Sequence, residues 1–137
     1  MSSRALIDVG ESTLKLLLAF EKKLTEAGIT FVRACTYRSS TEQDALYAQG
    51  RTTPGTVVTW AHGGQSPHNT TENGIPASQA ADYYPLLNGK LADCKTADEI
   101  ELWQKMGQIG KTCGLEWGGD WPAQKRDMPH FQLPKEH

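Results

Sequence analysis

The sequence contains few cysteines, and their arrangement is not typical of a structural site. The three that are present, Cys35, Cys94 and Cys113, form no C-x-x-C pair. An odd number at scattered spacings argues against a disulfide framework, and without paired thiolates a zinc knuckle is not expected. We therefore expect three buried or half-buried free thiols in a protein that is made in a reducing compartment.

Long apolar runs and an excess of positive charge are also lacking. The longest unbroken apolar stretch near the N-terminus, residues 16–20, is too short for a signal-peptide core or a membrane span. We therefore expect synthesis in the cytoplasm and no membrane association. Lysine and arginine together number 14 against 16 acidic residues, and the formal net charge is −2. This balance does not provide the basic surface that a nucleic-acid-binding protein needs.

The length of 137 residues and the 38% of hydrophobic residues are those of one ordinary globular domain. A domain of this size buries roughly two thirds of its unfolded surface, which is enough for a core without disulfides. No internal repeat, low-complexity tract or linker divides the chain. We expect one monomeric domain over residues 1–137.

Capping residues and hydrophobic spacing predict three helices and a small set of strands. Ser12 can cap a first helix that stops near Gly28, and capping-box spacings at residues 39–42 and 96–99 open two more. Trp103 lies at helical spacing and is expected in the core. Strands are predicted at residues 29–36, 80–84 and 129–133, with a hairpin at 86–92 and a short strand at 57–60 inside an otherwise irregular segment, 51–79. The pattern indicates an α+β domain with helices packed on a small antiparallel sheet.

Histidine and aspartate residues near the predicted loop ends are candidate metal ligands. Of the four histidines, His137 is terminal, and His62, His68 and His130 lie where loops meet strands. A single histidine is more often structural, so the argument rests on combination. Asp82 lies between apolar neighbours, where a carboxylate is costly to bury without a cation. His68, Asp82 and His130 would make the three-ligand set of a catalytic zinc site, but spacing alone makes this a weak signal, since no H-E-x-x-H helix is present.

Asp127 lies three residues before His130 and has two interpretations. It is either a surface acid in a turn beside Lys125 and Arg126, or a general base close to a metal. In the second case the carboxylate takes a proton from metal-bound water and passes it to the leaving amine. The residues alone leave both interpretations open.

Four motifs occur in the same order as in a known family. Ser66-Pro-His68-Asn, followed by residues 76–82, resembles the S-x-H…A-x-D signature of zinc D-alanyl-D-alanine carboxypeptidases and of their phage relatives, the L-alanyl-D-glutamate endopeptidases that serve as endolysins. Residues 36–52, 113–121 and 127–132 are similar to further stretches of the same group. The resemblance covers about residues 31–133, nearly the whole chain. It implies a zinc site in a surface cleft of a small α+β domain, with no separate wall-binding domain.

The resemblance also implies a role for each matching residue. His68, Asp82 and His130 match the zinc ligands, and Asp127 matches the catalytic acid/base, which is Glu in many relatives. Arg38 matches an arginine that holds the substrate or its oxyanion, because a guanidinium stays charged and offers paired donors; its alternative is a structural salt bridge. The expected substrate-binding residues are Ser66, Gln43 and Trp117, with Trp121 as a second wall of the groove. Ser66 could instead shape its loop, Gln43 could support a ligand or start a helix, and the tryptophans could be buried.

One departure concerns the loop between His68 and Asp82. Many relatives place these two residues closer together, and residues 70–75 look like an insertion. A flexible insertion of this size adds a closure cost on the order of 1 kcal/mol or less. It leaves Glu72 as a competing carboxylate for the position of Asp82.

The implied reaction is metal-assisted hydrolysis of an amide in the peptidoglycan stem peptide. The expected bond is L-alanyl-D-glutamate, and the expected role is that of an endolysin made in the host cytoplasm and acting on the cell wall after release. The alternatives are a D-alanyl-D-alanine carboxypeptidase and a catalytically silent wall-binding domain. The presence of Asp127 favours an enzyme over the silent domain, because a site without activity does not need a base.

Overall fold

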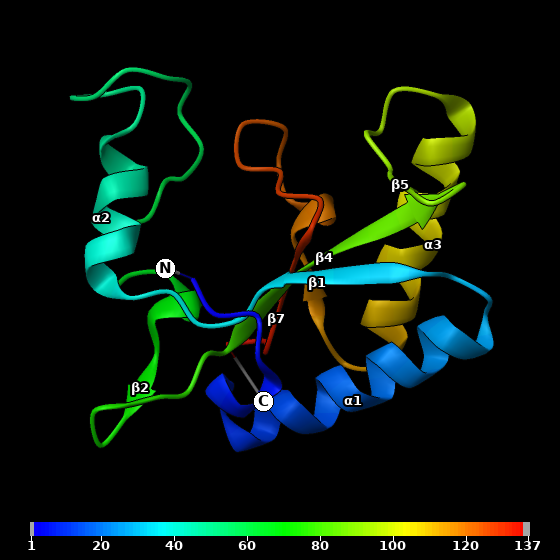
Figure 1. Ribbon diagram of the computed structural model, residues 1–137, viewed down its shortest axis with the longest axis horizontal. Helices are drawn as coiled ribbons and strands as arrows, with labels where there is room; N and C mark the ends of the chain where they lie inside the picture. The colour runs from blue at the N-terminus through cyan, green and yellow to red at the C-terminus, as the bar shows by residue number, and fades with distance from the viewer. Residues whose placement is uncertain (1, 136–137) are drawn as a thin grey trace.

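The computed structural model describes residues 2–135, so His137 lies outside the described residues. A small antiparallel sheet forms the centre of the domain (Figure 1). Its strand order is β1–β4–β7–β6, and β5 pairs with the far end of β4. The strands are β1 (Phe31–Cys35), β4 (Ala80–Leu87), β5 (Lys90–Leu91), β6 (Glu116–Trp117) and β7 (His130–Gln132). The α+β class and the antiparallel sheet that the sequence predicts are confirmed.

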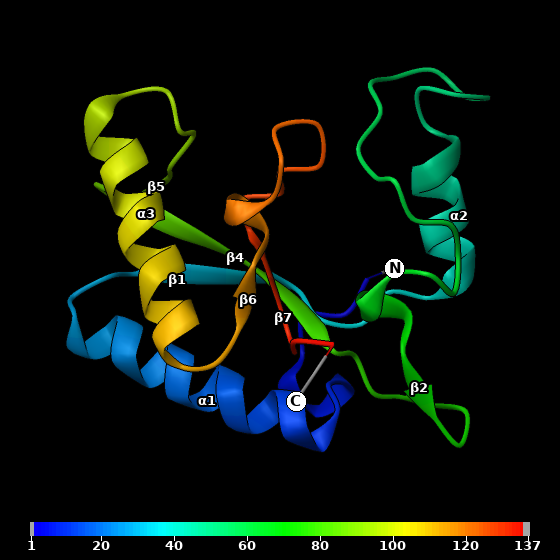
Figure 2. The ribbon, with the colours of Figure 1, turned by 180° about the vertical axis from the view of Figure 1, so that it is seen from behind.

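Residues 2–135 form three α-helices: α1 (Glu11–Glu26), α2 (Ser40–Ala48) and α3 (Ala97–Thr112). Helices α1 and α3 contact each other and lie together against the sheet, whereas α2 lies apart with its loops (Figures 1 and 2). The predicted capping boxes are present at Ser39 and Thr96. Ser12 is not a cap, because the N-cap of α1 is Gly10, two residues earlier, and Ser12 lies inside the helix. No helix among residues 2–135 has the length and apolar character needed to cross a membrane.

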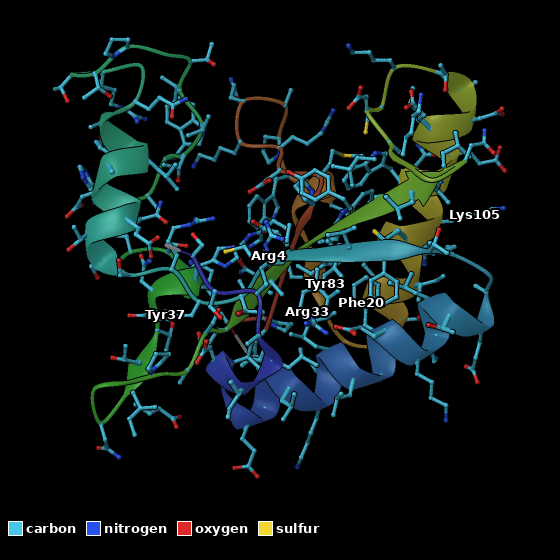
Figure 3. All side chains as sticks on the ribbon, viewed as in Figure 1. Arg4, Phe20, Arg33, Tyr37, Tyr83 and Lys105 are labelled. Atoms are coloured by element: carbon cyan, nitrogen blue, oxygen red, sulfur yellow. The ribbon has the colours of Figure 1, made fainter. Side chains whose placement is uncertain are left out.

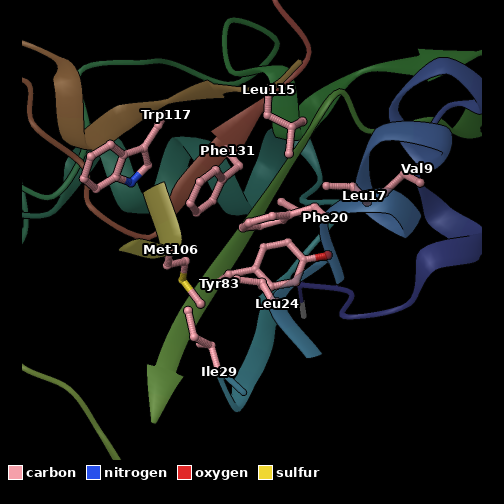
Figure 4. Packing of buried hydrophobic residues seen from close by; sticks show 11 residues of the cluster. Val9, Leu17, Phe20, Leu24, Ile29, Tyr83, Met106, Leu115, Trp117 and Phe131 are labelled. Carbon is pink, nitrogen blue, oxygen red and sulfur yellow. The ribbon is translucent and has the colours of Figure 1, made fainter. Parts of the chain in front are cut away.

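The hydrophobic core lies between α1, α3 and one face of the sheet (Figure 4). Phe20 of α1 meets Tyr83 of β4 edge-on, with ring centroids 5.0 Å apart, and packs against Phe131 of β7 at 4.6 Å. Each large side chain buried in this way contributes about 1.5–3 kcal/mol. Trp103 is also buried, as predicted, and its indole donates to the Ala92 carbonyl. The core therefore covers one face of the sheet and leaves the other face free.

A polar cluster ties α1 to the edge of the sheet. The guanidinium of Arg33 on β1 donates to both carboxylate oxygens of Glu21, at 2.8 and 3.1 Å, and to the Arg4 carbonyl at 2.9 Å (Figure 3). The hydroxyl of Tyr83 donates to the same carboxylate. Burial raises the pKa of the Tyr83 hydroxyl, and the negative Glu21 raises it further, so Tyr83 stays a neutral donor.

The segment between α2 and β4 is largely irregular, as predicted, but residues 57–60 do not form the predicted strand. Val57, Val58 and Trp60 are 42%, 54% and 58% exposed, and no neighbouring strand pairs with them. Residues 70–75, the apparent insertion, lie in a short hairpin of β2 (Thr71–Glu72) and β3 (Ile75–Pro76).

The hairpin leaves the site undisturbed because hydrogen bonds close its base. Asn73 and Gly74 have φ angles of 52° and 78°, the left-handed conformation that a tight hairpin turn requires. At the base, the Ala77 amide donates to the Thr70 carbonyl, and the Gln79 amide donates to the Pro67 carbonyl, both at 2.9 Å. The extra residues therefore project outward, while the chain on either side converges.

Candidate metal centre

The register of the sheet places Asp82 and His130 side by side. Asp82 on β4 is directly opposite His130 on β7 and opposite Cys35 on β1. Side chains alternate between the two faces of a strand. Because Ala81 and Phe131 point into the core, Asp82 and His130 point to the other face. The pairing thus brings a carboxylate and an imidazole together away from the core.

His68 reaches the same place from the 3-10 helix η2 (Pro67–Asn69). The hydroxyl of Ser66 accepts from the His68 amide at 3.2 Å and caps this turn. The Arg38 amide donates to the His68 carbonyl at 2.9 Å, which fixes the turn against the end of β1. Ser66 therefore shapes the loop, as the sequence allowed, and it also lines the cleft.

Both predicted histidine ligands approach the same carboxylate oxygen of the third predicted ligand, Asp82. Asp82 Oδ1 lies 3.1 Å from His68 Nε2 and 3.5 Å from His130 Nδ1. The two imidazoles meet edge to face with centroids 5.0 Å apart, and both residues are buried. Glu72, the competing carboxylate, is exposed on the β2–β3 hairpin and does not line the cleft. Among the described residues, Asp82 is the carboxylate that meets both histidines.

The outer nitrogen of each imidazole has its own acceptor. His68 Nδ1 lies 2.8 Å from the Thr36 carbonyl, and His130 Nε2 lies 2.7 Å from Gln132 Oε1. These acceptors hold the N–H of each neutral ring, so the other nitrogens turn lone pairs toward Asp82. Two lone pairs facing a carboxylate are stable only with a cation between them. The donor set therefore fits a zinc ion, which takes imidazole and carboxylate ligands.

The pKa shifts of His68 and Asp82 show that this buried cluster is stabilised by a positive charge. Burial lowers the pKa of His68, but the Asp82 carboxylate outweighs it and raises the pKa to about 10. Burial alone raises the pKa of Asp82, yet His68 and His130 reverse this and hold it well below its usual range. Without a metal, the proton on His68 supplies the missing positive charge.

Arg38 adjoins the second oxygen of the same carboxylate. Its Nη2 lies 3.7 Å from Asp82 Oδ2 and 3.6 Å from Cys35 Sγ, and its Nη1 donates to Gln43 Oε1 at 3.0 Å. Arg38 lines the cleft and is therefore positioned to meet a bound substrate. Its Nε–H is buried and finds no acceptor among the described residues.

Gln43 supports Arg38 instead of binding substrate, which corrects the substrate-binding prediction. Its side chain is fully buried in α2 and does not line the cleft. Its amide donates to the Ala61 carbonyl at 2.9 Å and to the Thr59 hydroxyl at 3.1 Å, while its oxygen accepts from Arg38. Gln43 thus links the guanidinium to the wall of the cleft.

Asp127 lies at the edge of the cluster with its side chain 46% exposed. Its Oδ2 is 3.9 Å from His130 Nδ1. Burial raises the pKa of Asp127, and the nearby Asp82 raises it further, which suits a group that must both take and return a proton. The Asp127 amide donates to the Gly118 carbonyl at 3.0 Å.

Gly118 allows the close approach of the Asp127 segment, and sequence reasoning did not assign it this role. A Cβ at Gly118 would lie 2.3 Å from the Asp127 carbonyl oxygen and 3.1 Å from His130 Cβ. Any side chain there would displace the backbone of both residues. The Gly118-Gly119 pair was the available signal, because adjacent glycines often mark a close backbone approach.

The cluster opens into a cleft of about 1030 Å³. Trp121 lines it, and its ring lies 5.1 Å from that of His130. The prediction that Trp117 lines the groove is wrong, because Trp117 is 6% exposed and belongs to the core. Its ring packs on Gly107, where a Cβ would lie 2.4 Å away.

Cys35 is a further ligand-type group that sequence reasoning placed only among the free thiols. It is buried, reduced and 3.8 Å from His68 Nδ1. Cys35, His68 and Asp82 can each offer a ligand atom within 4.8 Å of the others. The cross-strand pairing with Asp82 causes this proximity, and the sequence could not show it.

Comparison with known proteins shows the family of the chain. The peptidase M15 family described as D-alanyl-D-alanine carboxypeptidase matches residues 60–133, which contain His68, Asp82, Asp127 and His130. The chain belongs to this family. M15 proteins are metallopeptidases that act on peptidoglycan, so the chain is a peptidase of that class.

Two relatives refine the comparison. The chain is 38% identical over 123 residues to the peptidoglycan L-alanyl-D-glutamate endopeptidase CwlK of Bacillus subtilis, an alignment that covers 84% of this chain and 67% of that protein. The Serratia marcescens L-Ala D-Glu endopeptidase ChiX has a similar fold, with a TM-score of 0.63 at 17% identity. That similarity covers 98% of this chain and 89% of ChiX.

Proposed function

We propose that this M15 peptidase is a zinc-dependent endopeptidase that hydrolyses the L-alanyl-D-glutamate bond of the peptidoglycan stem peptide. The observation that carries the proposal is the convergence of His68 Nε2 and His130 Nδ1 on Asp82 Oδ1, beside Asp127. The 38% identity to CwlK supports the choice of bond.

His68, Asp82 and His130 would hold the metal. A zinc ion bound there would polarise the scissile carbonyl and lower the pKa of a bound water to about 7. Thr36 and Gln132 orient the two imidazoles through their outer nitrogens. Three protein ligands leave a position for water or substrate, which is the arrangement of a catalytic site.

Asp127 and Arg38 would carry out the remaining steps. Asp127 accepts the proton of the attacking water and returns it to the amine that leaves. Its exposure on the cleft side of His130 gives it access to both. Arg38 donates to the negative oxygen that forms at the scissile carbon, and Gln43 keeps the guanidinium in place.

The alternative reaction, removal of a terminal D-alanine, follows from the description of the family. The silent wall-binding alternative is disfavoured because both Asp127 and the ligand set are in place. We also propose an endolysin role, in which the monomeric enzyme is made in the host cytoplasm and reaches the wall after release. Lysis of intact cells upon expression together with a membrane-disrupting holin, but not upon expression alone, would test that role.

Mass spectrometry of digested muropeptides tests the proposed reaction. The zinc-loaded enzyme should release peptides that begin with D-glutamate, and the metal-free enzyme should release none until zinc is restored. Loss of terminal D-alanine alone would establish the carboxypeptidase instead. Full activity after complete metal removal would refute a zinc enzyme of any specificity.

A further inference from the structure

Two cations adjoin the proposed base and have no partner among the described residues. Lys125 and Arg126 are exposed, line the cleft and immediately precede Asp127 in the sequence. No hydrogen bond or ion pair of either side chain is present within residues 2–135. By contrast, Arg38 is already held by Gln43 and Asp82. The charges of Lys125 and Arg126 are therefore available to a ligand.

The turn that carries these cations is fixed at three points. The Lys125 amide donates to the Pro122 carbonyl at 2.8 Å, and Asp127 is tied to Gly118. The indole of Trp60, which also lines the cleft, donates to the Gln124 carbonyl at 2.8 Å. In Figures 1 and 2 this turn, drawn in orange, rises between the loops next to α2 and the α3 side of the sheet. The backbone of Lys125 and Arg126 is thus held beside the cleft.

The proposed substrate carries a negative charge close to this turn. A glutamyl residue has two carboxyl groups, and only one of them forms the next peptide bond. When the peptide continues through the side chain, the free carboxyl is attached to the same carbon as the scissile nitrogen. Asp127 must approach that nitrogen to return the proton. Neighbouring Cα atoms are 3.8 Å apart, so the long side chains of Lys125 and Arg126 can reach the same carboxylate.

The other charges of the cleft are engaged at the reacting bond. Asp82 and Asp127 both face the cleft, and Asp127 already experiences the charge of Asp82. The proposed zinc and Arg38 would offset these two carboxylates and the charge that forms on the scissile carbonyl. Lys125 and Arg126 have no such carboxylate partner among the described residues and are left to meet a third carboxylate on the substrate.

We propose that Lys125 and Arg126 bind the free carboxylate of the substrate's glutamyl residue and make the enzyme prefer this acid to its amide. The inference rests on the proposed endopeptidase function and adds a specificity to it. The amide has the same shape and lacks the charge, so it binds the turn as a neutral group. The preference is therefore electrostatic and decreases as salt screens the exposed cations.

The test compares two stem peptides that differ only at this group, D-glutamate in one and its α-amide in the other. We expect the zinc-loaded enzyme to cleave the acid with a kcat/KM about tenfold or more higher. The double variant Lys125→Gln/Arg126→Gln should bring the two kcat/KM values together, chiefly by cleaving the acid more slowly. The reversal Lys125→Glu/Arg126→Glu should favour the amide.

Lys22→Gln, an exposed cation on α1 outside the cleft, is the matched control and should keep the preference. Zinc content and circular dichroism check that each variant is folded. Equal cleavage of both peptides by the unaltered enzyme, or a preference that persists in the double variant, would overturn the inference and leave the endopeptidase function intact. If neither peptide is cut at the alanyl-glutamate bond, the proposed function fails first.

Discussion

The two faces of the central sheet are made by alternate residues of the same strands, yet they depend on different interactions. On β4, Ala81 and Tyr83 lie in the core against the helices, whereas Asp82 between them meets His68 and His130. The core face is held by apolar burial, so we expect it to stay folded without a ligand. The site face gathers buried polar groups that require a cation. Most of the stability is therefore expected from the core face, whereas the chemistry belongs to the site face.

Asp127→Ala should produce the largest effect and should leave the core face untouched. We expect kcat to fall by about 10²–10⁴-fold, because proton transfer is lost while the ligands remain. Zinc content, measured by atomic absorption, should not change. Asp120→Ala is the control, since Asp120 pairs with Lys111 and does not line the cleft. An active Asp127→Ala enzyme would show that another group is the base.

Phe131→Ala should lower the stability of the metal-free protein, whereas a change at its neighbour His130 should act mainly on zinc binding. Loss of the Phe131 ring from the core should lower the free energy of unfolding by about 3–5 kcal/mol, measured by urea denaturation of the metal-free protein. His130→Ala should cost much less there, but it should abolish the stabilisation that zinc gives. Similar losses for both variants without metal would mean that the two faces are not separable.

The titration of His68 tests whether the site face holds a proton in place of a metal. In the metal-free protein, NMR of the imidazole should give a midpoint near pH 10, because Asp82 raises the pKa from its ordinary 6.5. Its stabilising contribution is complete below about pH 6.5 and is lost as the pH rises through about 10. Asp82→Asn should move the midpoint below 6.5, since burial then dominates. An unchanged midpoint in that variant would contradict this account.

Gln132→Ala should have the smallest effect of the four. It removes the acceptor that orients His130 without removing a ligand, and we expect zinc affinity to weaken about 10–100-fold. Competition with a chromophoric chelator measures this affinity. Gln108→Ala, on the exposed surface of α3, should leave it unchanged. An equally tight zinc site in Gln132→Ala would show that the packing of β7 alone orients the imidazole.

Local signals in the sequence predicted the helices well, because capping residues and helical spacing act within one turn. Residues 57–60 are β-prone but lack a neighbouring strand, and the sequence could not show that absence. Trp117 lies beside glycines, yet its direction depends on the pairing of β6 with β7 and on the space above Gly107.

For the candidate site, too, the residues in local motifs could be predicted and the contacts between distant residues could not. The motifs predicted His68, Asp82 and His130 as ligands, and the structure brings all three together. Gln43 was a candidate from the sequence, but the partners of Gln43 and the place of Cys35 could not be predicted, because they depend on residues that are distant in the chain. Gln43 bonds across to Thr59, and Cys35 reaches the site through the register of β1 with β4.

The position of Asp82 on the middle strand has a consequence for biosynthesis. Its partners arrive from β1, from the η2 turn and, last in the chain, from β7. A chain that ends at residue 120 contains two of the proposed ligands, His68 and Asp82, and lacks the third, His130. The proposed metal site is complete only once β7 pairs with β4, so formation of the site depends on the last strand of the sheet.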